Sequence, residues 1–587
     1  MFSVQNFFLF FFILSFFHLN IGFCSNSFTF TGNYIDVILE EVYPATVVVQ
    51  NGKISQITRL TQNDSNFSYD YIAPGYVDSH IHVESSLLPP AEFARLAVQH
   101  GVVSTVSDPH EIANVLGIPG VEFMINSSNR VLFYFDFGAS PCVPASSFET
   151  SGATLSTEDI DTLFQNYSLT YLSEVMNYPG VINDDPIVMS KISVAKSYNY
   201  SIDGHAPGLT GNDAIKYISA GITTDHESTT LAEATFKIEH GMEILIREGS
   251  AAKNFAALES LIETNPHLVM LCTDDRHPND LIDSYIDELV QRAVFTYQHN
   301  LMNVIKAATY NPVTHYKLQN SLLQIGENAD MIILDQDLKV KQTYIQGNLV
   351  YDGENTLFPH SPEPNVPNNF SVGSKQVSDF ALVLPQNCSS VRVIVAQNQE
   401  IETDNINVSV SNFTFDNNSN LEPNEEQDYL KIAVINRYTN ESVPISIGII
   451  HNFGLKNCAI ASSVAHDSHN IIVVGTSDEL LNSAVNEIIN NKGGLSLAQL
   501  DQDQNITVTI LPLEIAGIMS NQDGFSVAQQ YANLDALAKQ CGSQLDAPFM
   551  TLSFMALSVV PNLKITDLGL VDSENFVFVD ICSEFNN

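Results

Sequence analysis

Strand-like and helical stretches alternate along residues 74–312, and this alternation limits the fold more than any other feature of the chain. Short apolar runs are followed by stretches such as "PAEFARLAVQHG" and "TTLAEATFKIEHGMEILIRE", which we expect to be helical. Repeated strand–helix units build parallel sheets, and about 240 residues is the size of one (β/α)8 barrel. The sequence therefore predicts an α/β protein with a (β/α)8 barrel at residues 74–312.

Strand-forming segments stand on both sides of this stretch. "YIDVILEEV" and "ATVVVQNGKISQIT" precede it, the second with the turn pair Asn51-Gly52, and "ADMIILDQDLKVKQTYIQGNLVYDG" follows it. We expect residues 25–73 and 313–356 to pair into a small composite β-sheet domain.

Residues 357–379 are rich in Pro, Asn and Ser and are predicted to be a linker. The region from 380 to 587 then mixes strand-like runs such as "VRVIVAQ" with helical runs such as "DELLNSAVNEIIN". We therefore expect an additional C-terminal α/β domain.

The first 24 residues carry no charged side chain, and Phe7–Phe17 is almost wholly apolar. This run is shorter than the ~20 residues of a membrane span and suits the core of a signal peptide, although the usual basic segment is missing. We predict a signal peptide at residues 1–24, cleaved before Ser25, and a secreted protein with no membrane segment after cleavage. An anchor that is never cleaved is the alternative.

Six cysteines lie beyond this segment, without any C-x-x-C pair: Cys142, Cys272, Cys388, Cys458, Cys541 and Cys582. This spacing argues against a thiolate zinc site. One or two disulfides are compatible with a secreted chain, but the sequence does not pair the cysteines. Twelve Asn-x-Ser/Thr sequons fit the same secretory route and predict a glycoprotein.

The chain has 24 Lys and Arg residues against 67 Asp and Glu residues, a formal net charge of −43. Because so acidic a surface repels phosphate backbones, nucleic acid is excluded as a partner. The apolar fraction of 44% is that of a globular protein rather than a disordered acidic chain. The oligomeric state stays open, and a homo-oligomer is one alternative.

The strongest local signal is "APGYVDSHIHVESS", an apolar run that ends in His80-Ile81-His82. Residues i and i+2 of a strand point to the same face, which in a barrel strand is the interior. The C-terminal strand ends are also where such barrels place their chemistry. His80 and His82 are therefore candidate metal ligands, although an isolated H-x-H pattern is weak evidence.

Residues of metal-binding type also end four later strand-like runs. In chain order these are Glu174 in "LTYLSEVMNYPG", His205 in "NYSIDGHAPG", His226 beside Glu227 in "GITTDHEST", and Asp274 beside Asp275 in "HLVMLCTDDRHP". Each alone has an ordinary explanation, such as a core histidine or, for Asp225, a helix cap. Together, five strand ends with these side chains predict a metallohydrolase barrel.

The order H-x-H, Glu, His, His, Asp resembles the amidohydrolase superfamily, and longer segments resemble its adenine deaminase family. They include "PGYVDSHIHVESSLL", "DPHEIANVLG", "EVMNYPGV", "DGHAPGL", "DHESTT" and "TDDRHP", and later "FGLKNCAIASSVAHDSHNIIVVGT" and "PFMTLSFMALSVVP". The resemblance includes the C-terminal region, which most amidohydrolases lack. It implies hydrolytic deamination of adenine to hypoxanthine and ammonia by a metal-activated hydroxide that attacks C6.

The resemblance also implies a binuclear metal centre, in which two ions lower the pKa of a shared water. It assigns His80 and His82 to one ion and His205 and His226 to the other, with Glu174 bridging both and Asp274 completing the site. Asp274 would also take the proton of the attacking water. Manganese or ferrous iron is implied, and zinc is compatible with the same ligands.

Further residues are candidates for contact with the substrate. Glu227 is a second catalytic candidate, which would exchange a hydrogen bond or proton with a ring nitrogen. Asp275 would accept a hydrogen bond from a ring N–H of the substrate, or would only stabilise a turn or a helix cap. Arg247 and Ser250 in "REGS", which we expect to follow a helical stretch, would contact the substrate or have no part in it.

Two histidine-containing groups have more than one interpretation. Asp108, His110 and Glu111 in "SDPHEIANV" would line the pocket or support the metal ligands. In "VAHDSHN", the residues of interest are His466, Asp467 and His469. They are an additional metal site, a wall of the pocket, or only a polar turn before the strand "IIVV".

Two other functions remain open at this point. Another purine or a lactam would suit the same metal ligands. A decayed, secreted binding protein is the other alternative, but decay should remove metal ligands first, and all six are present. The H-x-E…P-C-x-x-C pattern of cytidine deaminases is absent.

Overall fold

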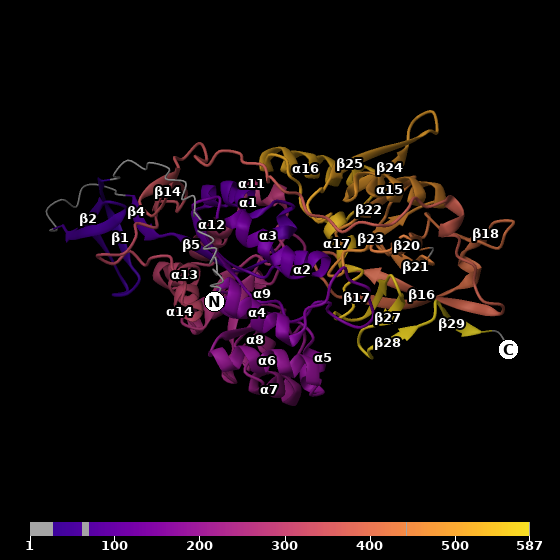
Figure 1. The fold of residues 1–587 in the computed structure, drawn as a ribbon, viewed down its shortest axis with the longest axis horizontal. Coiled ribbons are helices and arrows are strands. Elements are labelled where there is room, and N and C mark those ends of the chain that lie inside the picture. Colours follow the sequence, from indigo (N-terminus) through magenta and orange to yellow (C-terminus); the bar gives the residue numbers. More distant parts are fainter. Residues whose placement is uncertain (1–26, 61–69, 442, 586–587) are drawn as a thin grey trace, which may run out of the picture.

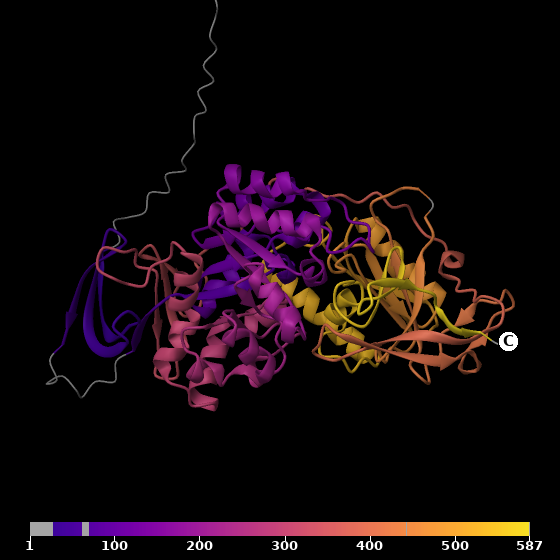
Figure 2. The same ribbon diagram turned by 90° about the horizontal axis from the view of Figure 1, so that it is seen from below.

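The computed structural model describes residues 27–60, 70–441 and 443–585. Figures 1 and 2 show three parts in a row: a small β-sheet part at one end, a barrel in the middle and the C-terminal region at the other end. The predicted signal peptide, residues 1–24, lies outside the described residues. Within them, no helix combines the length and the apolar character that crossing a membrane requires.

Eight parallel strands of the described chain form the barrel. They are β5 (Tyr76–Ile81), β6 (Val102–Ser107), β7 (Tyr134–Phe137), β8 (Tyr171–Val175), β9 (Ser201–Gly204), β10 (Thr224–Asp225), β11 (Glu243–Arg247) and β12 (Val269–Cys272). Single bridges, Ala139 to Leu172 and Ile81 to Asp274, join β7 to β8 and close the ring between β12 and β5. The predicted (β/α)8 barrel is confirmed.

Helices of the barrel part follow the strands in alternation. They are α1 (Pro90–Ala97), α2 (His110–Leu116), α3 (Ile118–Ser128), α4 (Thr157–Tyr167), α5 (Tyr178–Ile182), α6 (Pro186–Tyr198), α7 (Gly211–Ser219), α8 (Leu231–Glu239), α9 (Phe255–Leu258), α10 (Leu261–Thr264), α11 (Pro278–Asp283), α12 (Ile286–Gln291), α13 (Leu301–Ala308) and α14 (Tyr310–Tyr316). The N-terminus of α8 is capped by the Thr230 side chain, which accepts from the Glu233 N–H, so Asp225 is not its cap.

The stretch "TTLAEATFKIEHGMEILIRE" is only half helical, which corrects our expectation. Helix α8 ends at Glu239, Gly241 adopts a φ of 99°, and strand β11 begins at Glu243. Residues other than glycine rarely adopt that φ. Gly241 therefore lets the chain leave the helix and return to the barrel as the strand "EILIR". Arg247 therefore ends a barrel strand.

Strands from both sides of the barrel share one seven-stranded sheet, in the order β15-β14-β13-β4-β1-β2-β3. Their bounds are β1 (Phe28–Asp36), β2 (Glu41–Gln50), β3 (Lys53–Arg59), β4 (Tyr71–Pro74), β13 (Met331–Leu334), β14 (Val340–Ile345) and β15 (Asn348–Tyr351). The predicted turn at Asn51-Gly52 connects β2 to β3, with φ values of 53° and 76° that suit a tight hairpin. The domain limits given above remain a prediction.

The C-terminal region is built on a nine-stranded sheet, in which β17-β16-β21-β20-β23-β22-β24-β25 form the path and β29 pairs with β16. Its strands are β16 (Cys388–Ala396), β17 (Thr403–Ser409), β20 (Leu430–Ile435), β21 (Ser446–His451), β22 (Cys458–Ser462), β23 (Ile471–Gly475), β24 (Gly494–Leu500), β25 (Ile506–Pro512) and β29 (Cys582–Phe585). The shorter strands are β18 (Thr414–Phe415), β19 (Leu421–Glu422), β26 (Leu563–Thr566), β27 (Gly569–Asp572) and β28 (Val577–Val579). The helices are α15 (Asp478–Asn491), α16 (Gly524–Gln540) and α17 (Pro548–Phe554). An additional C-terminal α/β region is thus present, as expected.

Two disulfides tie this region together, Cys388–Cys582 and Cys458–Cys541. Polar contacts join the region to the barrel: the Gly524 N–H donates to Glu92 Oε2 over 3.0 Å, and Arg95 Nη1 donates to Asp523 over 2.8 Å. The segment predicted to be a linker lies against the barrel as well, since Arg95 Nε donates to the Phe358 carbonyl over 3.1 Å. The C-terminal region is therefore docked against the barrel, where helix α1 provides these contacts.

Candidate active site

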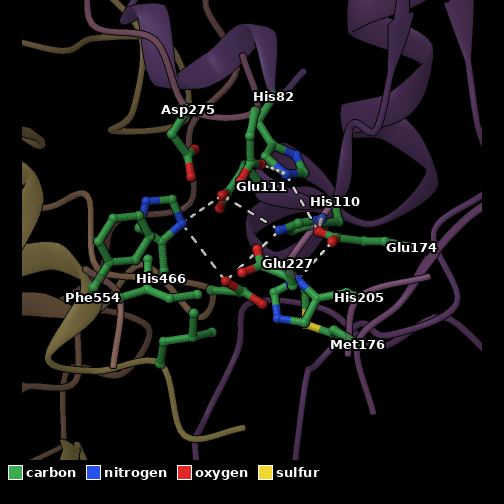
Figure 3. Close-up of a pocket in the computed structure, with 14 residues that line it drawn as sticks. His82, His110, Glu111, Glu174, Met176, His205, Glu227, Asp275, His466 and Phe554 are labelled. Atoms are coloured by element: carbon green, nitrogen blue, oxygen red, sulfur yellow. Dashed lines mark hydrogen bonds and ion pairs between the residues drawn. The ribbon is translucent and has the colours of Figure 1, made fainter. Parts of the chain in front are cut away.

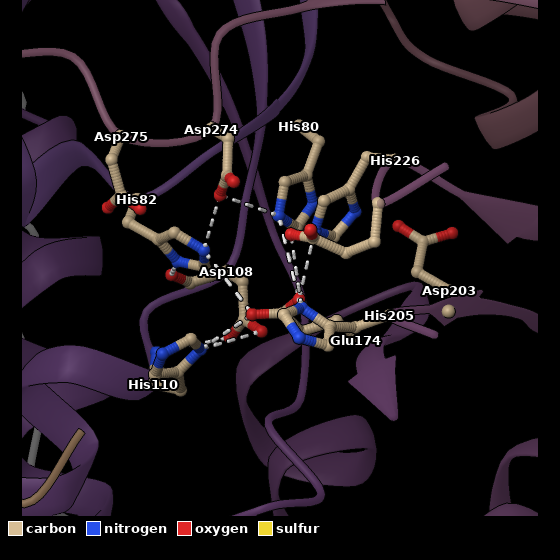
Figure 4. A network of polar contacts seen from close by, with 12 residues as sticks. His80, His82, Asp108, His110, Glu174, Asp203, His205, His226, Asp274 and Asp275 are labelled. Atoms are coloured by element: carbon tan, nitrogen blue, oxygen red, sulfur yellow. Dashed lines mark hydrogen bonds and ion pairs between the residues drawn. The ribbon is translucent and has the colours of Figure 1, made fainter. Parts of the chain in front are cut away.

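The six predicted metal ligands meet at the C-terminal ends of the barrel strands (Figure 4). Each lies at or just after a strand: His80 and His82 at β5, Glu174 in β8, His205 after β9, His226 after β10 and Asp274 after β12. None of them is more than 5% exposed. Buried imidazole and carboxylate groups converge here, as the spacing of the strand ends predicts.

Glu174 lies at the centre of the cluster. Its Oε2 is 2.9 Å from His205 Nδ1, 3.2 Å from His226 Nε2 and 4.0 Å from His80 Nε2. Its Oε1 is 3.3 Å from His82 Nε2. The two oxygens of one carboxylate therefore face different imidazoles.

Asp274 closes the cluster on another side. Its Oδ1 is 3.1 Å from His82 Nε2 and 3.5 Å from His80 Nε2, and its Oδ2 accepts from Arg247 Nη1 over 2.7 Å. Burial alone would raise the pKa of Asp274, but the neighbouring histidines and Arg247 hold it well below its usual range. Two groups of ligand atoms each lie within 4.8 Å of one another: His80, His226 and Asp274, and Glu174, His205 and His226.

The nitrogens of this cluster fit a divalent metal. Within the described part of the chain, His80 Nε2, His205 Nε2 and His226 Nε2 are buried without a hydrogen bond, which is costly unless a ligand occupies them. His82 Nδ1 lies 3.0 Å from the Asp108 carbonyl. Since a carbonyl only accepts, Nδ1 carries the proton and Nε2 is left to coordinate. Burial, together with His226, lowers the pKa of His80 to about 4, which favours the neutral form that binds metals.

Lys237 holds the loops that present the histidines after β9 and β10. Its Nζ is buried and donates to the Ala206 carbonyl over 2.7 Å, to Asp225 Oδ2 over 2.9 Å and to Glu233 Oε1 over 2.7 Å. The sequence pattern did not single it out, because a lysine in a helix is usually solvated. No short-range signal could have identified it.

We expect Lys237→Met to lower the free energy of unfolding by about 3–5 kcal/mol, because it leaves Asp225 and Glu233 buried without their cation. Urea unfolding followed by circular dichroism measures this. Lys216→Met is the matched control, since the Lys216–Asp184 pair lies at the surface and is worth about 1 kcal/mol or less. Equal effects of the two variants would contradict the role given to Lys237.

Asn254 is a second supporting residue that the sequence did not reveal. Its Nδ2 donates to the His226 and Ser228 carbonyls, each over 3.0 Å, and its Oδ1 accepts from the Arg247 N–H over 2.7 Å. One amide side chain thus fixes the loop after β10 against the end of β11.

Asp108, His110 and Glu111 lie next to the ligand cluster. His110 Nδ1 is 3.1 Å from Asp108 Oδ2 and 3.4 Å from Glu174 Oε1. The Ser140 hydroxyl donates to Asp108 Oδ1 over 2.6 Å. Asp108 therefore supports His110 and His82 from behind, while His110 and Glu111 reach the pocket wall.

A pocket opens above the cluster (Figure 3), and it has two sides. The barrel side includes His82, Glu174, His205, Glu227 and Asp274. The other side includes Ile401, His466, Asp467, Phe554 and Leu557 of the C-terminal region. Of the three interpretations of "VAHDSHN", the structure places His466 and Asp467 in the pocket wall, with His469 behind them.

Asp275 and Glu227 both line this pocket. Asp275 Oδ1 accepts from the Ser85 hydroxyl, and burial, together with Asp274, raises the pKa of Asp275 to about 6. Burial would also raise the pKa of Glu227, but Arg247, His205 and His226 together outweigh it and lower this pKa to about 2. Glu227 Oε2 is buried and has no hydrogen-bond partner among the described residues.

Arg247 and Ser250 do not line the pocket, contrary to one of our expectations. Arg247 ends β11 and lies behind Glu227 and Asp274, donating to both carboxylates. The Ser250 hydroxyl donates to Asp280 instead. Both side chains are thus engaged by carboxylates of the protein itself.

Two family models match the chain. The adenine deaminase C-terminal domain matches residues 401–577, and the amidohydrolase family matches residues 71–350. The chain is 50% identical to an adenine deaminase of Sulfurovum sp., over 94% of this chain and 99% of the relative. It is 46% identical to that of Borreliella afzelii (94% and 100%) and 44% identical to that of Methanosarcina barkeri (94% and 99%). Among solved structures, an N-acetyl-D-glucosamine-6-phosphate deacetylase from Mycobacterium smegmatis matches 55% of this chain and 99% of its own, with a TM-score of 0.42 and 13% identity.

These relatives correct the predicted location. We expected a secreted glycoprotein, whereas the chain matches 99% of the length of adenine deaminases from bacteria and archaea. A match of this kind gives no support to export or glycosylation, and the prediction of a secreted location is wrong.

The two matched ranges cover the barrel and most of the C-terminal region. The amidohydrolase match contains all six cluster residues, and the second match contains His466 and Asp467. The chain therefore belongs to the adenine deaminase family of metal-dependent amidohydrolases.

Proposed function

We propose that the chain hydrolyses adenine to hypoxanthine and ammonia at a binuclear centre of divalent metal ions. His80, His82, His205, His226, Glu174 and Asp274 would hold the two ions. The relatives named above are adenine deaminases, which supports the substrate. The buried His/Asp/Glu cluster supports the dependence on metal.

The observation that carries the binuclear proposal is the position of Glu174. Its Oε1 faces His82, and its Oε2 faces His205 and His226. A carboxylate placed between two sets of imidazoles suits a bridge between two ions. Imidazole and carboxylate ligands suit manganese or ferrous iron, and zinc is compatible with them.

The protein's own residues would orient the adenine ring and transfer the protons. The ions, when bound, supply Lewis acidity and a water of lowered pKa. Asp274 Oδ1 would hold a proton of that water, because Arg247 already occupies Oδ2. Glu227 Oε2, which lacks a partner, would accept a hydrogen bond from an N–H of the base. Adenine and water become hypoxanthine and ammonia, so the proton must pass on to the leaving amine.

The test is ammonia release by the purified holoenzyme from adenine, adenosine, guanine and cytosine. We expect turnover of adenine and little of the others. Activity on adenosine or guanine without activity on adenine would contradict the assignment and favour the alternative of another purine.

The same preparation tests the metal stoichiometry. After chelation we expect activity to fall to background, and two equivalents of Mn²⁺ per chain to restore it. Full recovery at one equivalent would contradict a binuclear centre, while leaving the substrate assignment intact.

A further inference from the structure

The pocket wall that faces the metal cluster comes from the C-terminal region, far along the chain from the barrel strands that carry the ligands. In Figure 3, His466 and Phe554 stand across the pocket from His82, His110 and Glu174. The rings of His466 and Phe554 stack, with centroids 4.7 Å apart and an interplanar angle of 19°. The backbone of this wall is anchored as well: the buried Lys564 Nζ donates to the Ile401 carbonyl over 2.6 Å and to the Phe554 carbonyl over 3.1 Å. A molecule in the pocket therefore meets a rigid second surface.

The His466 ring is held in one orientation by Glu111 of the barrel. His466 Nδ1 is 2.6 Å from Glu111 Oε1, and His469 Nε2 contacts Glu111 Oε2. The Ala465 N–H donates to His469 Nδ1 over 3.3 Å, so that nitrogen is bare and Nε2 carries the proton. A proton on Nε2 blocks coordination by that atom, which lies in ion-pair contact with Glu111 Oε2. This arrangement disfavours an additional metal site and favours a hydrogen-bonded wall.

The wall offers one donor and one acceptor to the pocket. Because Nδ1 is engaged with Glu111, His466 has Nε2 left for a ligand. Burial would lower the pKa of His466, but the carboxylates of Glu111, Asp467 and Asp275 together outweigh it and raise this pKa well above the usual value, so Nε2 carries a proton. Next to it, Asp467 is only 2% exposed, and its Oδ2 has no hydrogen-bond partner among the residues described. A buried carboxylate oxygen without a donor is costly and points to a ligand N–H.

The imidazole ring of a free purine base presents the matching pair, one N–H and one bare nitrogen. C6 and N9 are attached to opposite ends of the C4–C5 bond that the two rings share. A base whose C6 faces the metal ligands therefore turns N9 toward the opposite wall. A nucleoside carries its sugar on N9 and has no N–H to offer there.

We propose that His466 and Asp467 bind the imidazole ring of a free purine base and thereby exclude nucleosides. Asp467 accepts from the ring N–H, and His466 donates to the bare nitrogen. Glu111 and His469 are positioning residues that act through His466. The inference rests on the proposed deamination of adenine and adds a specificity site that the C-terminal region contributes.

The test compares kcat/KM for adenine and for 9-methyladenine, which lacks the N–H, in the metal-loaded enzyme. A site built around a buried hydrogen bond rejects the analogue strongly, so we expect a preference of about 10³-fold or more in the wild-type enzyme. Asp467→Asn keeps the size of the side chain, so any steric clash with the methyl group of 9-methyladenine stays the same and only the hydrogen bond changes. We expect it to reduce the preference at least about tenfold, mainly through a higher KM for adenine, with an unchanged metal content. Asp404→Asn, exposed on β17, is the matched control and should leave the preference unchanged.

Two further variants separate binding from folding. His466→Gln should raise KM for adenine more than it lowers kcat, and Glu111→Gln should give a smaller change of the same kind. An unchanged preference in Asp467→Asn, or an unchanged KM in His466→Gln, with full metal content would overturn the inference. A wild-type holoenzyme that does not deaminate adenine would instead refute the proposed function.

Discussion

Replacing Asp274 by Asn should reduce kcat for adenine by about 10³–10⁴-fold while both metal ions stay bound. The amide fills the same space and still has an oxygen to face His80 and His82. It cannot take a proton at neutral pH, however, and Arg247 would lose a charged partner on the other side. The expected signature is therefore lost turnover with retained metal, measured as ammonia release and as metal per chain on one sample.

Asp203→Asn is the matched control for this substitution. Asp203 is buried in the same barrel, and Figure 4 shows it apart from the cluster. Its carboxylate accepts from the Thr224 hydroxyl over 2.9 Å and from the Tyr316 hydroxyl over 3.0 Å. Burial raises the pKa of Asp203 to about 6, so the neutral acid that an amide resembles is more accessible to Asp203 than to an ordinary aspartate. We expect this variant to keep most of its activity. If Asp274→Asn also kept a tenth or more of the activity, Asp274 would not be the general base. If the variant lost metal, the effect on turnover would be explained by the role of Asp274 as a metal ligand alone.

The barrel and the metal cluster could be predicted because their signals are local. His80 and His82 share a strand face through their i, i+2 spacing, and the ends of parallel strands must meet at one edge of the barrel. Glu174 and Asp274 needed only their position after an apolar run to be placed near the histidines. The structure brings all of these together without any correction to their strands.

The residues that the sequence did not reveal depend on contacts between distant segments. Lys237 and Asn254 act through buried hydrogen bonds to neighbouring loops, and nothing in their own segments distinguishes them from solvated residues. Phe554 reaches the pocket only because the C-terminal region docks on the barrel. Arg247 was misplaced for another reason: helix α8 and strand β11 are separated by only three residues, with Gly241 in the middle, and their apolar residues together look like one long helix.

Glu174→Gln should lower the metal content from two ions to fewer than one per chain and bring deamination to background. Both sets of imidazoles face this carboxylate, with Oε1 at 3.3 Å from His82 and Oε2 at 2.9 Å from His205. An amide offers one oxygen and one NH₂ group, so it cannot bind an ion on each side, and it removes a negative charge from a buried cluster.

Glu84→Gln provides the control for this experiment. Glu84 is also buried in the barrel, in the short helix η2 (Val83–Ser86) directly after β5, and its Oε1 accepts from the Ile112 N–H over 3.3 Å. Burial raises the pKa of Glu84 to about 7, so the amide is again a mild change, and both ions should remain bound.

Metal analysis after gel filtration distinguishes three arrangements. Loss of both ions from Glu174→Gln supports a bridge, and loss of one ion places Glu174 on a single metal. Retention of both ions would mean that the histidines and Asp274 hold them without Glu174. Asp274 Oδ1, which lies 3.1 Å from His82 Nε2 and 3.5 Å from His80 Nε2, would then have to replace Glu174 as the central carboxylate.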